Sequence, residues 1–387
     1  MKEIGLYIHI PFCNHLCTYC DFVKRVSTNE TKDKYFQALC NEITLKKELF
    51  EKYIVKTIYI GGGTPSSISI KNLEKLFLKL SEYIDLTSIQ EFSFECNVED
   101  ISKELAILLS KYHVNRVSIG VESLNSRILT IMGRMCNYSD LCRKMQILRD
   151  FGLKNVNFDY MYGIEPMSLS EIIDDLSKLI DLKPTHISCY SLILEKNTIL
   201  YHRYLKGTFE PMSDDKETEI YYAIVDFLKL RGYNHYEISN FSISGYESIH
   251  NIIYWSNEEY LGIGLASSSY LMNYRFKNTD TLSEYIDYYT GDKTNLSIDD
   301  IFKATTTESE KISVKDQMDY EVILGFRMVK GININSFFDK YGNTIFNYYP
   351  EILNLISEGL LEKDEDYIRI SPSYLYLQNQ ILIKILN

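Results

Sequence analysis

Short apolar, β-branched runs alternate with amphipathic segments through the first half of the chain. The apolar runs predict six strands, at residues 5–10, 56–61, 90–96, 115–120, 155–160 and 186–192. The amphipathic segments predict helices at residues 31–50, 69–83, 101–112, 138–151 and 168–182. This α/β alternation predicts parallel strands with covering helices. Six such units favour a partial or full parallel (β/α) barrel over a sandwich.

The pattern loosens after residue 200. A helix predicted at residues 214–231 leads into YNHYEIS and then into a polar, aromatic stretch around HNIIYW (250–255), which we interpret as a loop. Residues 290–318 are rich in Thr, Asp, Lys and Ser, a composition that is typical of a linker.

The last part of the chain predicts a small α+β module. DYEVILGFRMVKG, INSFFDKYG and PEILNLISEGLLEK indicate three short helices, and YIRISPSYL indicates a β-ribbon, an arrangement like that of a winged helix. It has no basic stripe, which favours a structural or docking role. We therefore expect a barrel over residues 1–240, its extension over 241–300 and a C-terminal domain over 301–387.

Composition narrows the function classes. The chain has 387 residues, 45% of them apolar, enough for a substantial core. Its net charge of −12 argues against nucleic acid as the main partner, since phosphate binding needs clustered Lys and Arg. The opening MKEIGLYIHIPF lacks the apolar segment and cleavage site of a secretory signal. We expect a cytoplasmic protein, in which clustered cysteines are metal ligands or catalytic groups.

Residues that could bind a ligand or take part in catalysis lie at or after the ends of the predicted strands. Three cysteines follow the first strand and GGGTP (61–65) follows the second, and the later strands end near Glu95, Glu122, Asp159 and Tyr190. In β/α barrels the catalytic groups come from the carboxyl ends of several strands. The sequence therefore predicts a single site at one end of the barrel.

The three cysteines Cys13, Cys17 and Cys20 form a C-x-x-x-C-x-x-C pattern. Three thiols are one short of a closed tetrahedral zinc site and odd for a disulfide framework. The spacing suits a cubane cluster in which each thiolate binds one iron and the fourth iron stays open. The alternatives are a zinc loop or three incidental thiols.

YIHIPFCNHLCTYCDF resembles the cluster loop of radical S-adenosylmethionine (SAM) enzymes. More narrowly, it resembles the branch that contains oxygen-independent coproporphyrinogen III oxidase (HemN) and the haem chaperone HemW. The resemblance covers nearly the whole chain, through GGGTPS, EFSFECN, NRVSIGVESLN, MGR, NVNFDYMYG, HISCYSLILEKNT, YEISNF, HNIIYW, YLGIG, LGFRMVKG and LISEGLLEK.

The resemblance implies a set of site residues. Cys13, Cys17 and Cys20 would hold a 4Fe–4S cluster, and SAM would take the open iron. Gly62, Gly63 and Thr64 would let the SAM methionine moiety approach the backbone, and Glu95 would bind the SAM ammonium. Further positions match family contacts to SAM or to a second SAM-like ligand: Tyr7, Tyr19, Glu122, Arg134 and Asp159.

Two features favour the chaperone side of the branch. HemN has another cysteine two residues after the third cluster ligand, where this chain has Phe22, and it has an N-terminal extension before the first strand. HNIIYW also resembles a signature associated with haem binding in HemW. That resemblance implies haem contacts from His250, Asn251, Tyr254 and Trp255, whereas a lone histidine is more often a hydrogen-bonded structural residue.

Three departures from the family pattern concern the second-ligand pocket. Glu122 stands where the family usually has glutamine, Ser268 replaces a histidine, and YGIEPMS replaces the usual YGLPGQT. Glu122 exchanges a neutral amide for an anion. The identity of the substrate or cargo is therefore open.

We expect a haem chaperone that binds a 4Fe–4S cluster, SAM and haem and passes haem to a client protein that requires it. One alternative is a HemN-type enzyme that decarboxylates coproporphyrinogen III through a 5′-deoxyadenosyl radical. Another is a radical SAM enzyme acting on a substrate other than a tetrapyrrole. The scaffold is competent in principle for SAM cleavage, but no catalytic residue is assigned. The expected partners are haem or another tetrapyrrole, the client and an electron donor. The resemblance leaves room for a homodimer and for peripheral membrane contact through the client.

Overall fold

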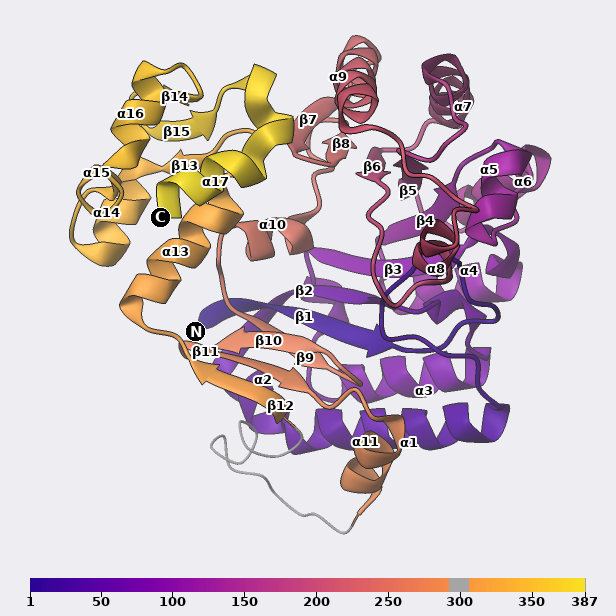
Figure 1. Ribbon diagram of the computed structural model, residues 1–387. Helices are drawn as coiled ribbons and strands as arrows, with labels where there is room; N and C mark the ends of the chain where they lie inside the picture. The colour runs from indigo at the N-terminus through magenta and orange to yellow at the C-terminus, as the bar shows by residue number, and fades with distance from the viewer. Residues whose placement is uncertain (292–305, 387) are drawn as a thin grey trace.

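The computed structural model describes residues 1–291 and 306–386, which form a large mixed sheet covered by helices and a smaller C-terminal module (Figure 1). Six strands lie side by side in sequence order and run parallel, as the alternating pattern predicts. They are β1 (Lys2–Ile10), β2 (Tyr53–Gly62), β3 (Glu91–Asn97), β4 (Arg116–Glu122), β5 (Asn155–Tyr162) and β6 (His186–Ser191).

The helices of this half cover the sheet. They are α1 (Asn29–Leu45), α2 (Lys47–Lys52), α3 (Ile70–Ser81), α4 (Lys103–Lys111), α5 (Ser126–Met132), α6 (Tyr138–Asp150), α7 (Leu169–Asp181), α8 (Ile199–Leu205) and α9 (Asp214–Leu230). Their apolar faces pack on strands whose side chains are buried on both sheet faces, such as Ile8 and Phe94. Ser168 begins α7 with a capping box, because its side chain accepts from the Glu171 backbone while Glu171 returns the bond.

Strands from later in the chain extend both sides of the parallel sheet. β9 (Tyr260–Ile263) lies parallel to β1, followed by antiparallel β10 (Ser268–Leu271), β11 (Tyr274–Asn278) and β12 (Thr306–Lys311). On the other side, β8 (Asn240–Ser242) and β7 (Asn234–Glu237) continue from β6. Within the described residues β12 and β7 form the two edges, so the sheet is a partial barrel.

The linker prediction at residues 290–318 is wrong in its second half. Residues 306–311 form β12, which pairs with β11, and α13 (Val314–Gly325) begins shortly after it. Polar composition is compatible with an edge strand, where side chains face solvent. The first half of the predicted linker, residues 292–305, lies outside the described residues.

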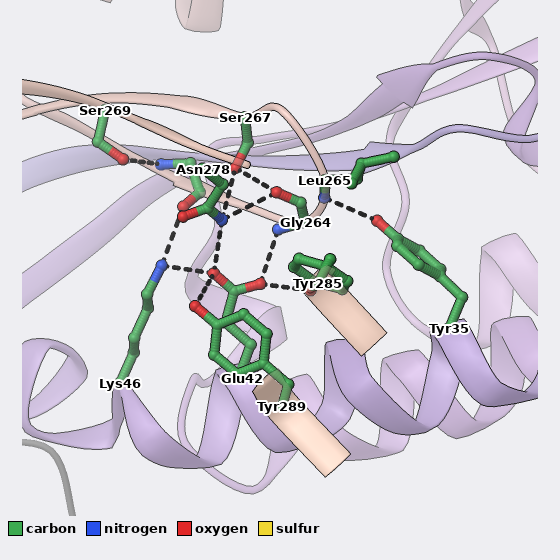
Figure 2. A network of polar contacts seen from close by, with 11 residues as sticks. Tyr35, Glu42, Lys46, Gly264, Leu265, Ser267, Ser269, Asn278, Tyr285 and Tyr289 are labelled. Atoms are coloured by element: carbon green, nitrogen blue, oxygen red, sulfur yellow. Dashed lines mark hydrogen bonds and ion pairs between the residues drawn. The ribbon is translucent and has the colours of Figure 1, made fainter. Parts of the chain in front are cut away.

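A buried carboxylate joins α1 to the segment that carries β9, β11 and α11 (Leu282–Thr290) (Figure 2). Glu42 has no exposed surface and forms an ion pair of 2.5 Å with Lys46. Its two oxygens accept hydrogen bonds from the backbone of Gly264 and from the side chains of Asn278, Tyr285 and Tyr289. A buried charge needs such partners, so this network fixes β9 beside β1.

The C-terminal module contains the predicted helices and a three-stranded sheet. Besides α13, its helices are α14 (Ile334–Tyr341), α15 (Ile345–Tyr348), α16 (Glu351–Ser357) and α17 (Gln378–Leu386). Its strands are β13 (Ile332–Asn333), β14 (Leu361–Lys363) and β15 (Tyr367–Ile370). Among the residues that the structure describes, none of the helices is both long and apolar enough to cross a membrane.

Candidate functional site

The carboxyl ends of the parallel strands surround a cavity of about 400 Å³, as predicted for a barrel site. The cysteine loop after β1, the glycine loop after β2 and the ends of β3 to β6 all contribute to it. Most of the predicted site residues line this cavity: Cys13, Cys17, Tyr19, Cys20, Gly62, Gly63, Thr64, Glu95, Glu122, Arg134 and Asp159.

Backbone hydrogen bonds to three other segments hold the cysteine loop in place. The Cys13 amide donates to the Arg25 carbonyl, so the start of the loop is joined to the segment that follows it. The Thr18 amide donates to the Met132 carbonyl at the end of α5, and the Leu200 amide donates to the Thr18 carbonyl. The thiols therefore occupy positions set by the fold around them.

The three thiols fit a 4Fe–4S cluster. All of them face the cavity, and burial raises the pKa of each thiol above its ordinary value. Iron offsets that cost, because metal binding displaces the thiol proton. In the described part of the chain, no three His, Cys, Asp or Glu side chains converge as they would on a single metal ion. A cubane does not require that convergence, since each thiolate binds a different iron.

The glycine loop packs so tightly that side chains would clash with protein atoms. A Cβ on Gly63 would lie 2.8 Å from the Phe12 carbonyl oxygen. A Cβ on Gly62, whose φ is +114°, would lie 2.5 Å from the His9 ring. The glycines are therefore required by contact with the end of β1, not only by access for a ligand as the sequence suggested. Thr64 adds a contact of 3.4 Å from its hydroxyl to the Cys13 sulfur.

Glu95 presents a half-buried carboxylate at the end of β3. Oε1 accepts from the Tyr59 hydroxyl at 2.7 Å and Oε2 accepts from the Gly62 amide at 3.0 Å. Burial raises its pKa to about 7, and these hydrogen bonds partly oppose that shift. A carboxylate oxygen can accept more than one hydrogen bond, so both oxygens keep capacity for a cationic ligand.

Arg134 and Glu122 lie together across the cavity. Arg134 is 7% exposed and donates from Nη1 to Asn97 Oδ1 at 2.8 Å and from Nη2 to the Gly120 carbonyl at 2.6 Å. Its Nε has no hydrogen-bond partner among the described residues. Burial raises the pKa of Glu122 to about 7, and the nearby Arg134 charge opposes that shift. A buried guanidinium with an unused N–H is suited to a ligand carboxylate.

Asp159, on β5, is a further acidic residue of the cavity lining. It accepts from Ser118 at 3.0 Å and from Asn157 at 2.8 Å, and burial raises its pKa. Tyr19 lies on the cysteine loop in the cavity wall. Tyr7 is not among the lining residues, and its hydroxyl instead contacts His9 Nδ1 at 2.9 Å.

The HNIIYW segment is a helix, α10 (Ile249–Trp255), and the loop interpretation is wrong. It begins where Ser248 caps the Asn251 amide and where the buried Glu91 carboxylate accepts from the Ile249 and His250 amides. Helix α10 packs on β1 and β2 near the amino ends of the strands, opposite the cavity (Figure 1). A seven-residue helix has little stability of its own, so these tertiary contacts fix it.

His250 is 1% exposed, and both of its ring nitrogens have partners. Nδ1 lies 2.7 Å from the Thr57 hydroxyl and Nε2 lies 2.7 Å from the Tyr254 hydroxyl. Burial and the Arg116 charge lower the pKa of His250 to about 3, so the ring is neutral. The structure does not bring His250, Asn251, Tyr254 or Trp255 to the cavity.

The departures from the family pattern fall in different places. Glu122 lies in the cavity wall, whereas Ser268 is exposed at the start of β10 and is not among the lining residues. Sequence reasoning did not assign several side chains that reach the cavity, namely Phe22, Lys24, Tyr59, Ser118 and Ile193. For Tyr59 the alternation of β2 was a usable signal, because Tyr59 and Gly61 share a strand face two residues apart.

Comparisons with known proteins agree with this fold and site. Residues 7–179 match the radical SAM superfamily, and residues 312–373 match the HemN C-terminal domain. The structure of coproporphyrinogen III oxidase (HemN) from Escherichia coli superposes with a TM-score of 0.82 at 20% identity, covering 99% of this chain and 90% of that one. The barrel and its cysteine loop therefore define a radical SAM protein.

Curated relatives narrow the family. The heme chaperone HemW of Lactococcus lactis is 36% identical over 100% of this chain and 98% of its own length. The heme chaperone HemW of Bacillus subtilis is 32% identical, covering 97% of each chain. This chain belongs to the HemW family of radical SAM proteins. Membership of the radical SAM superfamily implies a 4Fe–4S cluster and SAM as cofactors.

Proposed function

We propose that this protein is a haem chaperone that binds a 4Fe–4S cluster, SAM and haem and delivers haem to a client protein. The observation that carries the proposal is full-length similarity to proteins named heme chaperone HemW, at 36% identity with the Lactococcus lactis protein. An intact cysteine loop and acidic cavity in this chain support it.

In this proposal the cluster and SAM bind in the cavity at the carboxyl ends of the strands, called the open end of the barrel below. Cys13, Cys17 and Cys20 hold the cluster, which when bound supplies electron-transfer chemistry. Glu95 accepts from the SAM ammonium, since both its oxygens are held in place by Tyr59 and Gly62. The remaining cavity residues contact SAM or a second SAM-like ligand: Tyr19, Gly63, Thr64, Glu122, Arg134 and Asp159. Tyr7 reaches this site only indirectly, since its hydroxyl contacts His9, whose ring lies against Gly62.

Haem contacts are assigned to α10, from His250, Asn251, Tyr254 and Trp255. Because both ring nitrogens of His250 are hydrogen-bonded, ligation of haem iron requires one of these bonds to be exchanged. His250→Ala should lower haem affinity, measured by absorbance titration, while iron and sulfide content stay at the wild-type level. Undiminished haem affinity in this variant would remove the ligand assignment and leave the chaperone proposal standing.

The rival function is decarboxylation of coproporphyrinogen III. At the position of the additional HemN cysteine this chain has Phe22, whose side chain is 67% exposed at the cavity mouth. A phenyl ring cannot supply the chemistry of a thiol, so this position favours the chaperone. The client and the electron donor for the cluster are the partners that the proposal requires.

The test is made under anaerobic conditions on cluster-loaded protein. One sample is titrated with haem, and a second is incubated with SAM, a reductant and coproporphyrinogen III. We expect haem to bind and little or no protoporphyrinogen IX to form. Turnover at an ordinary enzymatic rate, about 10 per second, together with no haem binding would overturn the proposal.

A further inference from the structure

Tyr59 connects helix α10 at the amino ends of the strands, called the closed end below, with the cavity at their carboxyl ends. Thr57 and Tyr59 are two residues apart on β2 and therefore share the face that points into the barrel. His250 contacts both of them, because its Nδ1 lies 2.7 Å from the Thr57 hydroxyl and its ring centroid lies 5.2 Å from that of Tyr59. Tyr59 in turn lines the cavity and donates to Glu95 Oε1 at 2.7 Å.

A second chain of hydrogen bonds runs from the same helix to Asp159. The Ser248 amide donates to the Tyr236 hydroxyl oxygen at 3.2 Å, and that hydroxyl lies 2.8 Å from His186 Nε2. His186 Nδ1 lies 2.6 Å from Asn157 Oδ1, and Asn157 Nδ2 donates to Asp159 at 2.8 Å. Because an amide oxygen only accepts, His186 Nδ1 carries the proton and Tyr236 donates to Nε2. Each hydrogen bond in this series therefore has an assigned donor and acceptor.

Two carboxylates of the cavity, Glu95 and Asp159, are thus connected to α10 and its N-cap. Glu95 depends on the Tyr59 hydroxyl for the orientation of Oε1, and the Tyr59 ring is held against His250 on its inner side. A Cβ on Gly5 would lie 3.3 Å from the His250 ring, so β1 also lies against the imidazole. The imidazole consequently has little room to move without displacing Tyr59.

We infer that His250 is a positioning residue for SAM, acting through the Tyr59 ring and hydroxyl on the Glu95 carboxylate at the other end of the barrel. The inference rests on the part of the proposed function that places the SAM ammonium at Glu95, and it does not depend on haem binding. A ligand whose cation meets a carboxylate held in place loses less free energy to ordering than one that meets a mobile carboxylate.

The experiment measures SAM affinity by calorimetry on anaerobic, cluster-loaded protein. His250→Gln and Tyr59→Phe are expected to weaken SAM binding by about 5- to 10-fold each. The double variant should bind SAM no more weakly than the single variant with the lower SAM affinity, since both changes break the same connection. Iron and sulfide content should stay at the wild-type level in all three.

Ile253→Val is the matched control, because it removes one methylene from a buried residue of α10 and costs stability without touching Tyr59 chemistry. Its SAM affinity should equal that of the wild type. Should His250→Gln fail to fold, Thr57→Val removes only the hydroxyl that holds Nδ1 and is expected to weaken SAM binding by about 3-fold.

Three results would overturn the inference. The first is wild-type SAM affinity in a folded, cluster-loaded His250→Gln protein, or in Thr57→Val where the former does not fold. The second is additive losses in the double variant, which would mean that His250 and Tyr59 act independently. The third is an equal loss of SAM affinity in Ile253→Val, which would reduce the effect to general stability of α10. A wild type that binds no SAM would instead overturn the proposed function.

Discussion

Arg134 and Glu95 in the cavity differ from Glu91 and His250 at the closed end in how fully they are hydrogen-bonded. At the open end, Arg134 Nε has no partner among the described residues, and Glu95 keeps capacity on both oxygens. At the closed end, Glu91 accepts from the amides of Ile249 and His250 and from the hydroxyls of two serines, and His250 has a partner on each ring nitrogen.

This difference distinguishes groups that can bind a ligand from groups that support the fold. Unused hydrogen-bonding capacity in a buried cavity is costly unless a ligand satisfies it, so the open end is built to receive one. Glu91 and His250 at the closed end, whose polar atoms have partners, contribute rigidity instead. The motif HNIIYW resembles a haem-binding signature, but in this conformation its histidine takes part in that rigidity.

The largest effect is expected at the open end, from loss of the cluster ligands. Changing Cys13, Cys17 or Cys20 to Ala should abolish the 4Fe–4S cluster, because in the proposed site each thiolate holds a different iron. Iron and sulfide analysis after anaerobic reconstitution measures this. Cys142→Ala should keep the full cluster, since Cys142 lies on α6 and is not among the cavity-lining residues. Full iron and sulfide in all three ligand variants would mean that the cluster site is misassigned.

At the closed end, the strongest expected effect is on stability. Glu91 is 3% exposed; burial opposes the charge of the buried Arg116, and the Glu91 charge is the first of those that raise the pKa of this guanidinium. Glu91→Ala should lower the free energy of unfolding by about 3–5 kcal/mol, because it leaves buried donors without an acceptor and a buried cation without this opposing charge. Urea denaturation measures the change. Phe22→Ala, at the exposed rim of the open end, should stay within about 0.5 kcal/mol of the wild type.

His250 gives the closed end a distinctive pH dependence. Its folded-state pKa of about 3 lies below the ordinary value near 6.5, so the unfolded chain binds the proton first. Stability from the neutral ring is complete above about pH 6.5 and is lost as the pH falls toward about 3. The stability advantage of the wild type over His250→Gln should therefore shrink by about 2–3 kcal/mol between about pH 7 and about pH 4.5. Other titrating groups are common to both proteins, and a constant difference would contradict the burial argument.

Much of the fold could be predicted from the sequence because local pattern and tertiary environment agree there. The strand predicted at residues 155–160 is observed as Asn155–Tyr162, and the helix predicted at residues 138–151 as Tyr138–Asp150. Helix α10 was missed because its start is fixed by Glu91, more than 150 positions away in the chain. Strand β12 was missed because its polar residues become a strand only by pairing with β11.

The site was predictable where a residue's type and its place towards or after the end of a strand carried the signal. Cys13, Glu95 and Asp159 all follow this rule, and the structure brings them to one cavity. The contact from Tyr59 to Glu95 could not be foreseen, since it joins positions 36 residues apart on neighbouring strands. The same is true of the burial of His250, because nothing in HNIIYW itself states which strands cover it.

The most direct test of the central claim, that the open end binds SAM through its acidic wall, is calorimetry on Glu95→Ala. The variant is loaded with its cluster under anaerobic conditions and compared with the wild type. Removing the carboxylate should weaken SAM binding by about 10- to 100-fold, because a charge-assisted hydrogen bond to the ammonium is lost, and should leave iron and sulfide unchanged. Equal SAM affinity in the variant and the wild type, at full cluster content, would contradict the account.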